Sequence, residues 1–211
     1  AEDGMRDVAV TGVQTCALPL SAIQVLELPE CYQVGEWQHN KTTVQRQAAL
    51  IKEICQHIYE YTETEQDIYY SVENNTLGEA ALVSIAEIGE ENIPGIFLSE
   101  PRRPGADRRY RKGFNTSNKT KLAVCAKFKS LIEQKKLHIA SKNLISELKT
   151  FVAVDHSFKA KLGETDDLVM SMLLAVRMVQ ALQSFDAQLD EHVKDMDEYI
   201  QPMPFVMSVG F

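Results

Sequence analysis

Glu73 is the first of three acidic residues whose types and surroundings could support chemistry. It follows the run 68–72, whose β-branched and aromatic residues predict a strand, and it precedes Asn74-Asn75-Thr76, which predict a turn into a helix. The sites of α/β proteins usually lie just beyond the carboxyl end of a strand. An acid at a strand end is also a common solvated surface residue, so Glu73 alone does not define a site.

Asp166 and Asp167 are the other two acids, and they stand where a long helix is predicted to begin. Acids in a first helical turn usually do no more than complement the helix dipole. Here the pair runs directly into Leu168-Val169-Met170, so the second acid must lie close to the apolar face. A buried carboxylate costs roughly several kcal/mol unless a cation compensates it. We interpret the pair as a candidate metal ligand, and the spacing does not choose between its two members.

The donor types favour a hard divalent cation. Carboxylates without His or Cys suit Mg²⁺ or Mn²⁺, and one or two such ions can activate a water and stabilise the leaving oxygen of a phosphodiester. The cysteines have no CxxC spacing and predict reduced, packed thiols rather than a zinc site; they are Cys16, Cys31, Cys55 and Cys125.

The elements that would position these acids follow from hydrophobic periodicity. Strands are predicted at 22–28 and 32–39 as a hairpin, at 68–72 and at 93–98; helices are predicted at 43–61, 77–88, 118–136, 141–151 and from 166 onward. Segment 137–139 is strand-like, and segment 151–163 fits either a strand pair or a loop. The methionines of the last helix are interpreted as core residues. This alternation predicts an α/β fold with a mixed sheet.

Composition and charge fit a soluble domain that touches a polyanion along one face. The 211 residues suit one domain, and the sequence contains no apolar run long enough to span a membrane. The net charge is −8, yet ten of the 22 Lys and Arg lie between Arg102 and Lys129 with a single acid. A solvated loop is the alternative interpretation of this segment. The predicted DNA contacts are Arg102, Arg103, Arg108, Arg109, Arg111, Lys112, Lys119 and Lys121.

The two ends of the chain differ from its middle. Ala9 to Leu20 resembles the translated adapter text found at the ends of assembled environmental sequences, so we predict that residues 1–20 are a non-native segment without function. The acidic segment 184–211 is predicted to be an exposed tail.

Several motifs, in order, resemble one known family. Tyr70 to Ala81 resembles the central acidic motif of the nuclease domain in large terminase subunits of tailed bacteriophages. Segments 113–116, 119–121 and 141–148 match the middle of that domain, and Gly163 to Ser171 resembles its last acidic motif. The resemblance extends from Ser21 to the C-terminus.

The resemblance implies a ribonuclease-H-like mixed sheet flanked by helices, with the nuclease domain at 21–183. It implies Mg²⁺- or Mn²⁺-dependent cutting of double-stranded concatemeric DNA with little sequence preference. Three acids serve this family: one on the first strand, one matching Glu73, and one in the Asp166-Asp167 pair. The implied partners are the portal and the small terminase subunit, and the implied place is the host cytoplasm at the procapsid portal.

The sequence departs from the family pattern at three points. The first acid is expected just before Ser21, where the adapter-like text stands, and neither Asp3 nor Asp7 has the right surroundings. We therefore expect an N-terminally truncated domain that can be inactive in this form. Thr165 stands where some relatives carry a histidine. No GxxxxGK[ST] phosphate loop is present, so ATP is expected only in a motor domain outside this chain.

Two alternative functions stay open from sequence. One is another ribonuclease-H-like nuclease of the resolvase or transposase type, which the order of the middle motifs disfavours. The other is a catalytically inactive DNA-binding or assembly module, which metal titration would distinguish.

Overall fold

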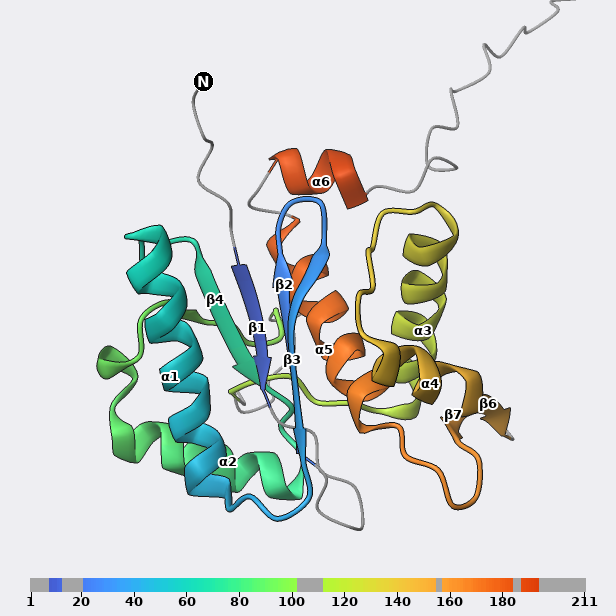
Figure 1. Ribbon diagram of the computed structural model, residues 1–211, viewed down its shortest axis with the longest axis horizontal. Helices are drawn as coiled ribbons and strands as arrows, with labels where there is room; N and C mark the ends of the chain where they lie inside the picture. Colours follow the sequence, from blue (N-terminus) through green and yellow to red (C-terminus); the bar gives the residue numbers. More distant parts are fainter. Residues whose placement is uncertain (1–7, 13–20, 102–111, 155–156, 184–186, 194–211) are drawn as a thin grey trace, which may run out of the picture.

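The computed structural model describes residues 8–12, 21–101, 112–154, 157–183 and 187–193. Its centre is a five-stranded sheet in the order β3-β2-β1-β4-β5, in which β1, β2 and β3 are antiparallel neighbours and β1, β4 and β5 run parallel (Figure 1). The strands are β1 Val8–Gly12, β2 Ser21–Glu27, β3 Tyr32–His39, β4 Ile68–Val72 and β5 Ile96–Phe97. The predicted mixed sheet is confirmed.

Strand β1 occupies the middle of this sheet, between β2 and β4. The sequence prediction gave residues 1–20 no role, whereas the structure uses Val8–Gly12 as the central strand. The run Val8-Ala9-Val10-Thr11 has the β-branched residues of a strand, a signal that the resemblance to adapter text had outweighed. Residues 1–7 and 13–20 lie outside the described residues.

Helices cover both faces of the sheet. Helices α1 Val44–Thr62 and α2 Thr76–Ile88 lie on one face; α5 Asp167–Leu182 lies on the other, with α3 Asn118–Glu133 and α4 Lys142–Thr150 packed against it (Figure 1). Period-2 alternation along the strands divides the core accordingly. In β2, Ile23 and Val25 join the α1 side, while Ala22 and Leu26 join the α5 side.

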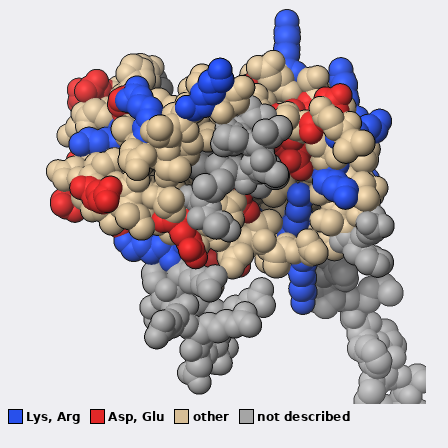
Figure 2. All heavy atoms as spheres, turned by 90° about the horizontal axis from the view of Figure 1, so that it is seen from below, with Lys and Arg blue, Asp and Glu red and all other residues tan. Residues whose placement is uncertain are grey.

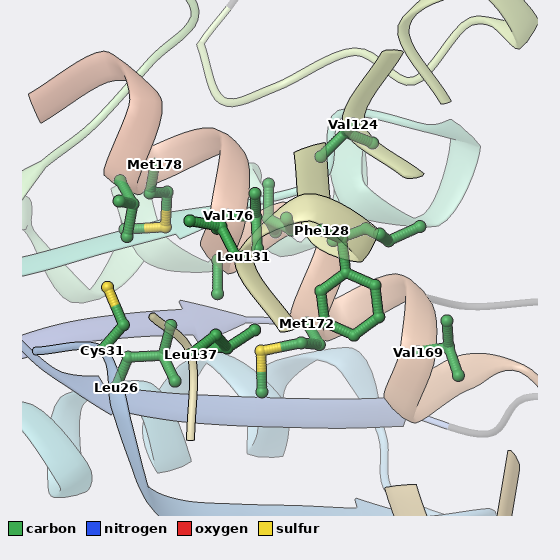
Figure 3. Close-up of a cluster of buried hydrophobic side chains, with 14 of the residues drawn as sticks. Leu26, Cys31, Val124, Phe128, Leu131, Leu137, Val169, Met172, Val176 and Met178 are labelled. Atoms are coloured by element: carbon green, nitrogen blue, oxygen red, sulfur yellow. The ribbon is translucent and has the colours of Figure 1, made fainter. Parts of the chain in front are cut away.

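Helix α5 is the central helix of the larger core cluster, and every residue from Asp166 to Val179 is buried. Met172 and Val176 pack among Leu26, Phe128 and Leu131, which come from β2 and α3 (Figure 3). A helix that is apolar all round is expected to be enclosed, and the prediction that its methionines are core residues is confirmed. The acids at its start therefore face a largely apolar interior.

The remaining elements refine the predicted boundaries. Segment 151–163 contains a strand pair, β6 Phe151–Val154 with β7 Ser157–Ala160, and segment 137–139 contributes a single bridge from His138 to Tyr32. A short 3-10 helix covers Glu90–Asn92. Strand β5 is shorter than predicted because Gly95, with φ +108°, interrupts the extended backbone directly before it.

Helix α6 Ala187–Val193 departs from the predicted exposed tail 184–211 over these residues, whereas residues 184–186 and 194–211 lie outside the described residues. Leu189 and Val193 have no exposed surface and belong to the cluster around α5. The sequence interpretation relied on the acidic composition of this segment and overlooked that Leu189 and Val193, spaced i, i+4, share one helical face. None of the described helices is long and apolar enough to cross a membrane.

Candidate metal centre at the end of β4

Glu73 stands directly after β4 and is held there by backbone pairing with the segment that precedes α3. Phe114 N donates to Val72 O at 3.1 Å, and Asn74 N donates to Phe114 O at 2.8 Å. Glu73 is buried at this position, with 4% of the residue exposed. The carboxylate is therefore a buried group at the carboxyl end of a strand, as the sequence predicted by position but not by burial.

The residues after Glu73 explain why this motif reads Glu-Asn-Asn-Thr-Leu-Gly. Asn75 caps α2 by accepting from Gly78 N at 2.8 Å, and its amide donates to Glu73 Oε2 at 3.2 Å. A Cβ on Gly78 would lie 1.6 Å from the Glu73 carbonyl oxygen, so only glycine allows this approach. Gly113, with φ +74°, is likewise required because a Cβ would lie 2.5 Å from Val72 O.

Asp166 and Asp167 begin α5 from within the core, with 8% and 2% of their surfaces exposed. Asp166 occupies the N-cap position, and its side chain makes no capping hydrogen bond. Its Oδ2 instead lies 3.8 Å from Lys121 Nζ. The prediction that the second acid lies against apolar surroundings agrees with the burial of Asp167.

The electrostatics place Glu73 and Asp166 in one site. Burial raises the pKa of Glu73, while a hydrogen bond from Thr116 and the charges of Arg177 and Lys121 lower it; the negative charge of Asp166 raises it. The net direction for Glu73 is upward, because burial outweighs the nearby hydrogen bond and positive charges. A site of this kind gains from a bound cation.

Arg177 is a buried cation of α5 that sequence reasoning missed. Its guanidinium lies 3.1 Å from Glu100 Oε1 and 5.0 Å from the centre of the Phe114 ring, and it donates to Thr116 Oγ1 at 3.4 Å. Burial lowers the pKa of Arg177, and the charges of Glu100 and Glu73 raise it. A signal was present, because Arg177 is the single charged residue between Leu168 and Val179.

Lys121, predicted as a DNA contact, lies at the acid cluster. Its side chain is 15% exposed, and its ammonium is 5.4 Å from the centre of the Phe151 ring. Lys112 pairs with Glu90 and lies over the ring of Phe97, and Lys119 is exposed in the first turn of α3.

The other five predicted contacts, Arg102, Arg103, Arg108, Arg109 and Arg111, lie outside the described residues. Figure 2 views the molecule from the side toward which β1 and β4 run in Figure 1, and it shows acidic and basic side chains intermixed there. The DNA contacts stay a prediction.

The described part of the chain contains no group of three or more His, Cys, Asp or Glu side chains placed to hold a metal ion. Thr11 pairs with Ser71 and Gly12 with Val72, so the end of β1 lies beside the end of β4, and β1 carries no acid. The charge of Asp166 nevertheless acts on Glu73, and carboxylates are ligands that a hard divalent cation accepts. Such an ion can be held by one or two carboxylates while it keeps several waters.

The mixed five-stranded sheet with helices on both faces fits the ribonuclease-H-like fold that the sequence resemblance implies. A family model described as "Terminase RNaseH-like domain" matches residues 15–179, and the chain belongs to that family. The predicted resemblance to the nuclease domain of large terminase subunits is confirmed.

Solved structures agree on the fold. The large terminase nuclease of thermophilic phage G20c with bound magnesium is 19% identical, with a TM-score of 0.58 over 83% of this chain and 82% of that one. The Thermus phage P74-26 large terminase nuclease domain is 17% identical, with a TM-score of 0.55 over 83% and 80%. The human cytomegalovirus terminase nuclease domain, soaked with manganese and with an inhibitor bound, is 13% identical, with a TM-score of 0.61 over 84% and 85%. No curated protein sequence matches the chain.

Proposed function

We propose that this chain is a metal-dependent endonuclease domain that cuts double-stranded DNA during genome packaging. The observation that supports this most directly is the placement of buried Glu73 beside Asp166, with Asp167 at the start of the same helix. Nuclease domains of similar fold were solved with bound magnesium and after soaking in manganese, which supports a divalent cation here.

Each side chain of the site has a distinct task in this proposal. Glu73 and one or both aspartates would hold one or two Mg²⁺ or Mn²⁺ ions. When bound, such an ion supplies an activated water and neutralises charge that develops on a phosphodiester. Lys121 and Arg177 keep the acids from repelling one another before DNA arrives, and Thr116 orients the Glu73 carboxylate.

The role in a packaging machine rests on the family. We propose that the domain acts on phage DNA in the host cytoplasm at the procapsid portal, with the portal and the small terminase subunit as partners. The basic residues of 102–121 would contact phosphates rather than bases, so cutting would have little sequence preference. We assign no ATP chemistry to the chain, since it contains no phosphate loop.

A second candidate function is an inactive DNA-binding or assembly module. One observation favours it: β1 offers no acid beside Glu73. A cleavage assay on supercoiled plasmid with Mn²⁺ distinguishes the two candidates. The nuclease proposal expects nicks and linear product that disappear in Glu73→Ala and in Asp166→Asn/Asp167→Asn, with Lys129→Ala as a surface control. Plasmid that stays intact while it still binds the protein would favour the inactive module.

A further inference from the structure

Glu147 of α4 is a buried carboxylate that no step above uses, and 8% of it is exposed. Its Oε2 accepts from the backbone N–H of Leu168 at 2.9 Å and of Val169 at 3.2 Å. Its Oε1 accepts from Thr165 Oγ1 at 2.9 Å and from Gln38 Nε2 at 3.0 Å. Four donors from three segments therefore converge on one side chain.

The two backbone donors are the ones that an N-cap residue normally serves. In α5 the N-cap is Asp166, and Leu168 and Val169 are the second and third helical residues. An aspartate at an N-cap usually accepts from these N–H groups with its own side chain. Asp166 makes no such bond here, because Glu147 from another helix already satisfies both groups.

The other carboxylate oxygen of Glu147, Oε1, holds the side chain in the position from which it caps α5. Gln38 belongs to β3, and Thr165 directly precedes the acid pair, so Glu147 ties α4 to the sheet and to the turn before α5. Ser141 caps α4 by accepting from Leu144 N at 3.0 Å, and Gln33 of β3 accepts from the Ser141 N–H at 2.9 Å. The N-terminus of the helix that carries Glu147 is thus tied to β3 as well.

We propose that Glu147 is a positioning residue of the acidic site: it caps α5 in place of Asp166 and so leaves the Asp166 carboxylate directed toward Glu73 and a metal ion. The link to a metal rests on the proposed function, whereas the capping relationship does not. Glu147→Gln removes the negative charge and leaves one accepting oxygen for the four donors, so it should weaken the cap of α5.

The first test uses the metal-free protein. Glu147→Gln should speed amide hydrogen exchange of Leu168 and Val169 at least roughly tenfold, the protection of about one hydrogen bond, relative to amides further along α5. NMR couplings should show the Asp166 side chain turning to the capping rotamer. Thr43→Ala removes the N-cap of α1, where Thr43 accepts from Arg46 N, and controls for the loss of an ordinary cap. Unchanged exchange or an unchanged Asp166 rotamer would overturn the proposal.

The second test measures Mn²⁺ binding by calorimetry. Loss of a residue that orients a metal ligand typically costs about 10- to 100-fold in affinity, and Glu147→Gln should do so while Thr43→Ala does not. Equal losses in both variants would reduce Glu147 to a stability role and overturn the proposal. If the wild-type protein binds no Mn²⁺, the proposed function fails, and the exchange and rotamer measurements still decide whether Glu147 positions Asp166.

Discussion

Lys121 Nζ lies 3.8 Å from Asp166 Oδ2, and the two side chains are only 15% and 11% exposed. The ammonium also lowers the pKa of Glu73, so one lysine serves both acids of the site. A divalent cation would have to share this space with the lysine charge. Lys121 therefore neutralises part of the negative charge of the two acids, which lowers the affinity expected for a metal ion.

Replacing Lys121 should strengthen metal binding. In Lys121→Met the positive charge and its contact with the Phe151 ring are lost while an unbranched side chain remains, so Mn²⁺ affinity should rise by about 1 kcal/mol, roughly fivefold. Lys129→Met is the matched control, since Lys129 lies on the same helix and pairs with Glu133 at the exposed surface. Calorimetry measures both. A weaker Mn²⁺ affinity in Lys121→Met would show that the lysine supports the ion rather than competing with it.

An acid on β1 should complete the site. The backbone of Thr11 pairs with that of Ser71, two residues before Glu73, so position 11 lies beside the acid-bearing end of β4. Thr11→Asp should raise Mn²⁺ affinity about tenfold or more, because a further carboxylate joins the ligand set. Val10→Asp is the control. Val10 pairs with Tyr70, which belongs to the core cluster on the α1 side of the sheet, so this substitution should destabilise the fold without raising Mn²⁺ affinity. Equal affinities for Thr11→Asp and wild type would contradict this register argument.

For Gly78→Ala, the sign of the stability change tests the close approach of α2 to Glu73. Alanine in place of a helical glycine usually stabilises by about 0.5–1 kcal/mol. Here the new Cβ would meet the Glu73 carbonyl oxygen at 1.6 Å, so we expect destabilisation by about 1–3 kcal/mol. Gly163→Ala is a useful comparison, because nothing lies within 4 Å and only its φ of +88° opposes the substitution. Urea unfolding measures both. A more stable Gly78→Ala would mean that α2 does not pack against Glu73.

The raised pKa of Glu73 makes stability fall as pH rises. Between the ordinary carboxyl pKa and the higher pKa of the folded state, the folded protein binds more protons than the unfolded chain, so the free energy of unfolding decreases with pH. In EDTA, Glu73→Gln should therefore be more stable than wild type at neutral pH and should lose that advantage in acid, below the ordinary pKa. Urea unfolding at both pH values is the measurement. An advantage that grew in acid would contradict the assigned burial.

Local signals in the sequence were enough for most of the fold. The hairpin of β2 and β3, the Thr43 cap, β4 and the start of α5 all follow from short-range periodicity and capping residues. Glu73 and Asp166 were found for the same reason, since each lies at the end of an element that the sequence marks clearly.

The features that sequence reasoning missed depend on contacts between distant segments. Glu147 accepts from Leu168 N although the strands β6 and β7 separate the two residues in sequence. Arg177 of α5 pairs with Glu100, which follows β5 much earlier in the chain. No local pattern encodes either pairing. Strand β1 was missed for another reason: its β-branched residues are typical of a strand, but the resemblance to adapter text outweighed that local signal.

Diffraction from crystals soaked in Mn²⁺, recorded with anomalous scattering, tests the central claim most directly. The account predicts one anomalous peak within coordinating distance of Glu73 and of at least one of Asp166 and Asp167, and its loss in Glu73→Ala. Full soaking with no peak between β4 and the start of α5, or a peak that persists without Glu73, would contradict the assignment of a metal centre.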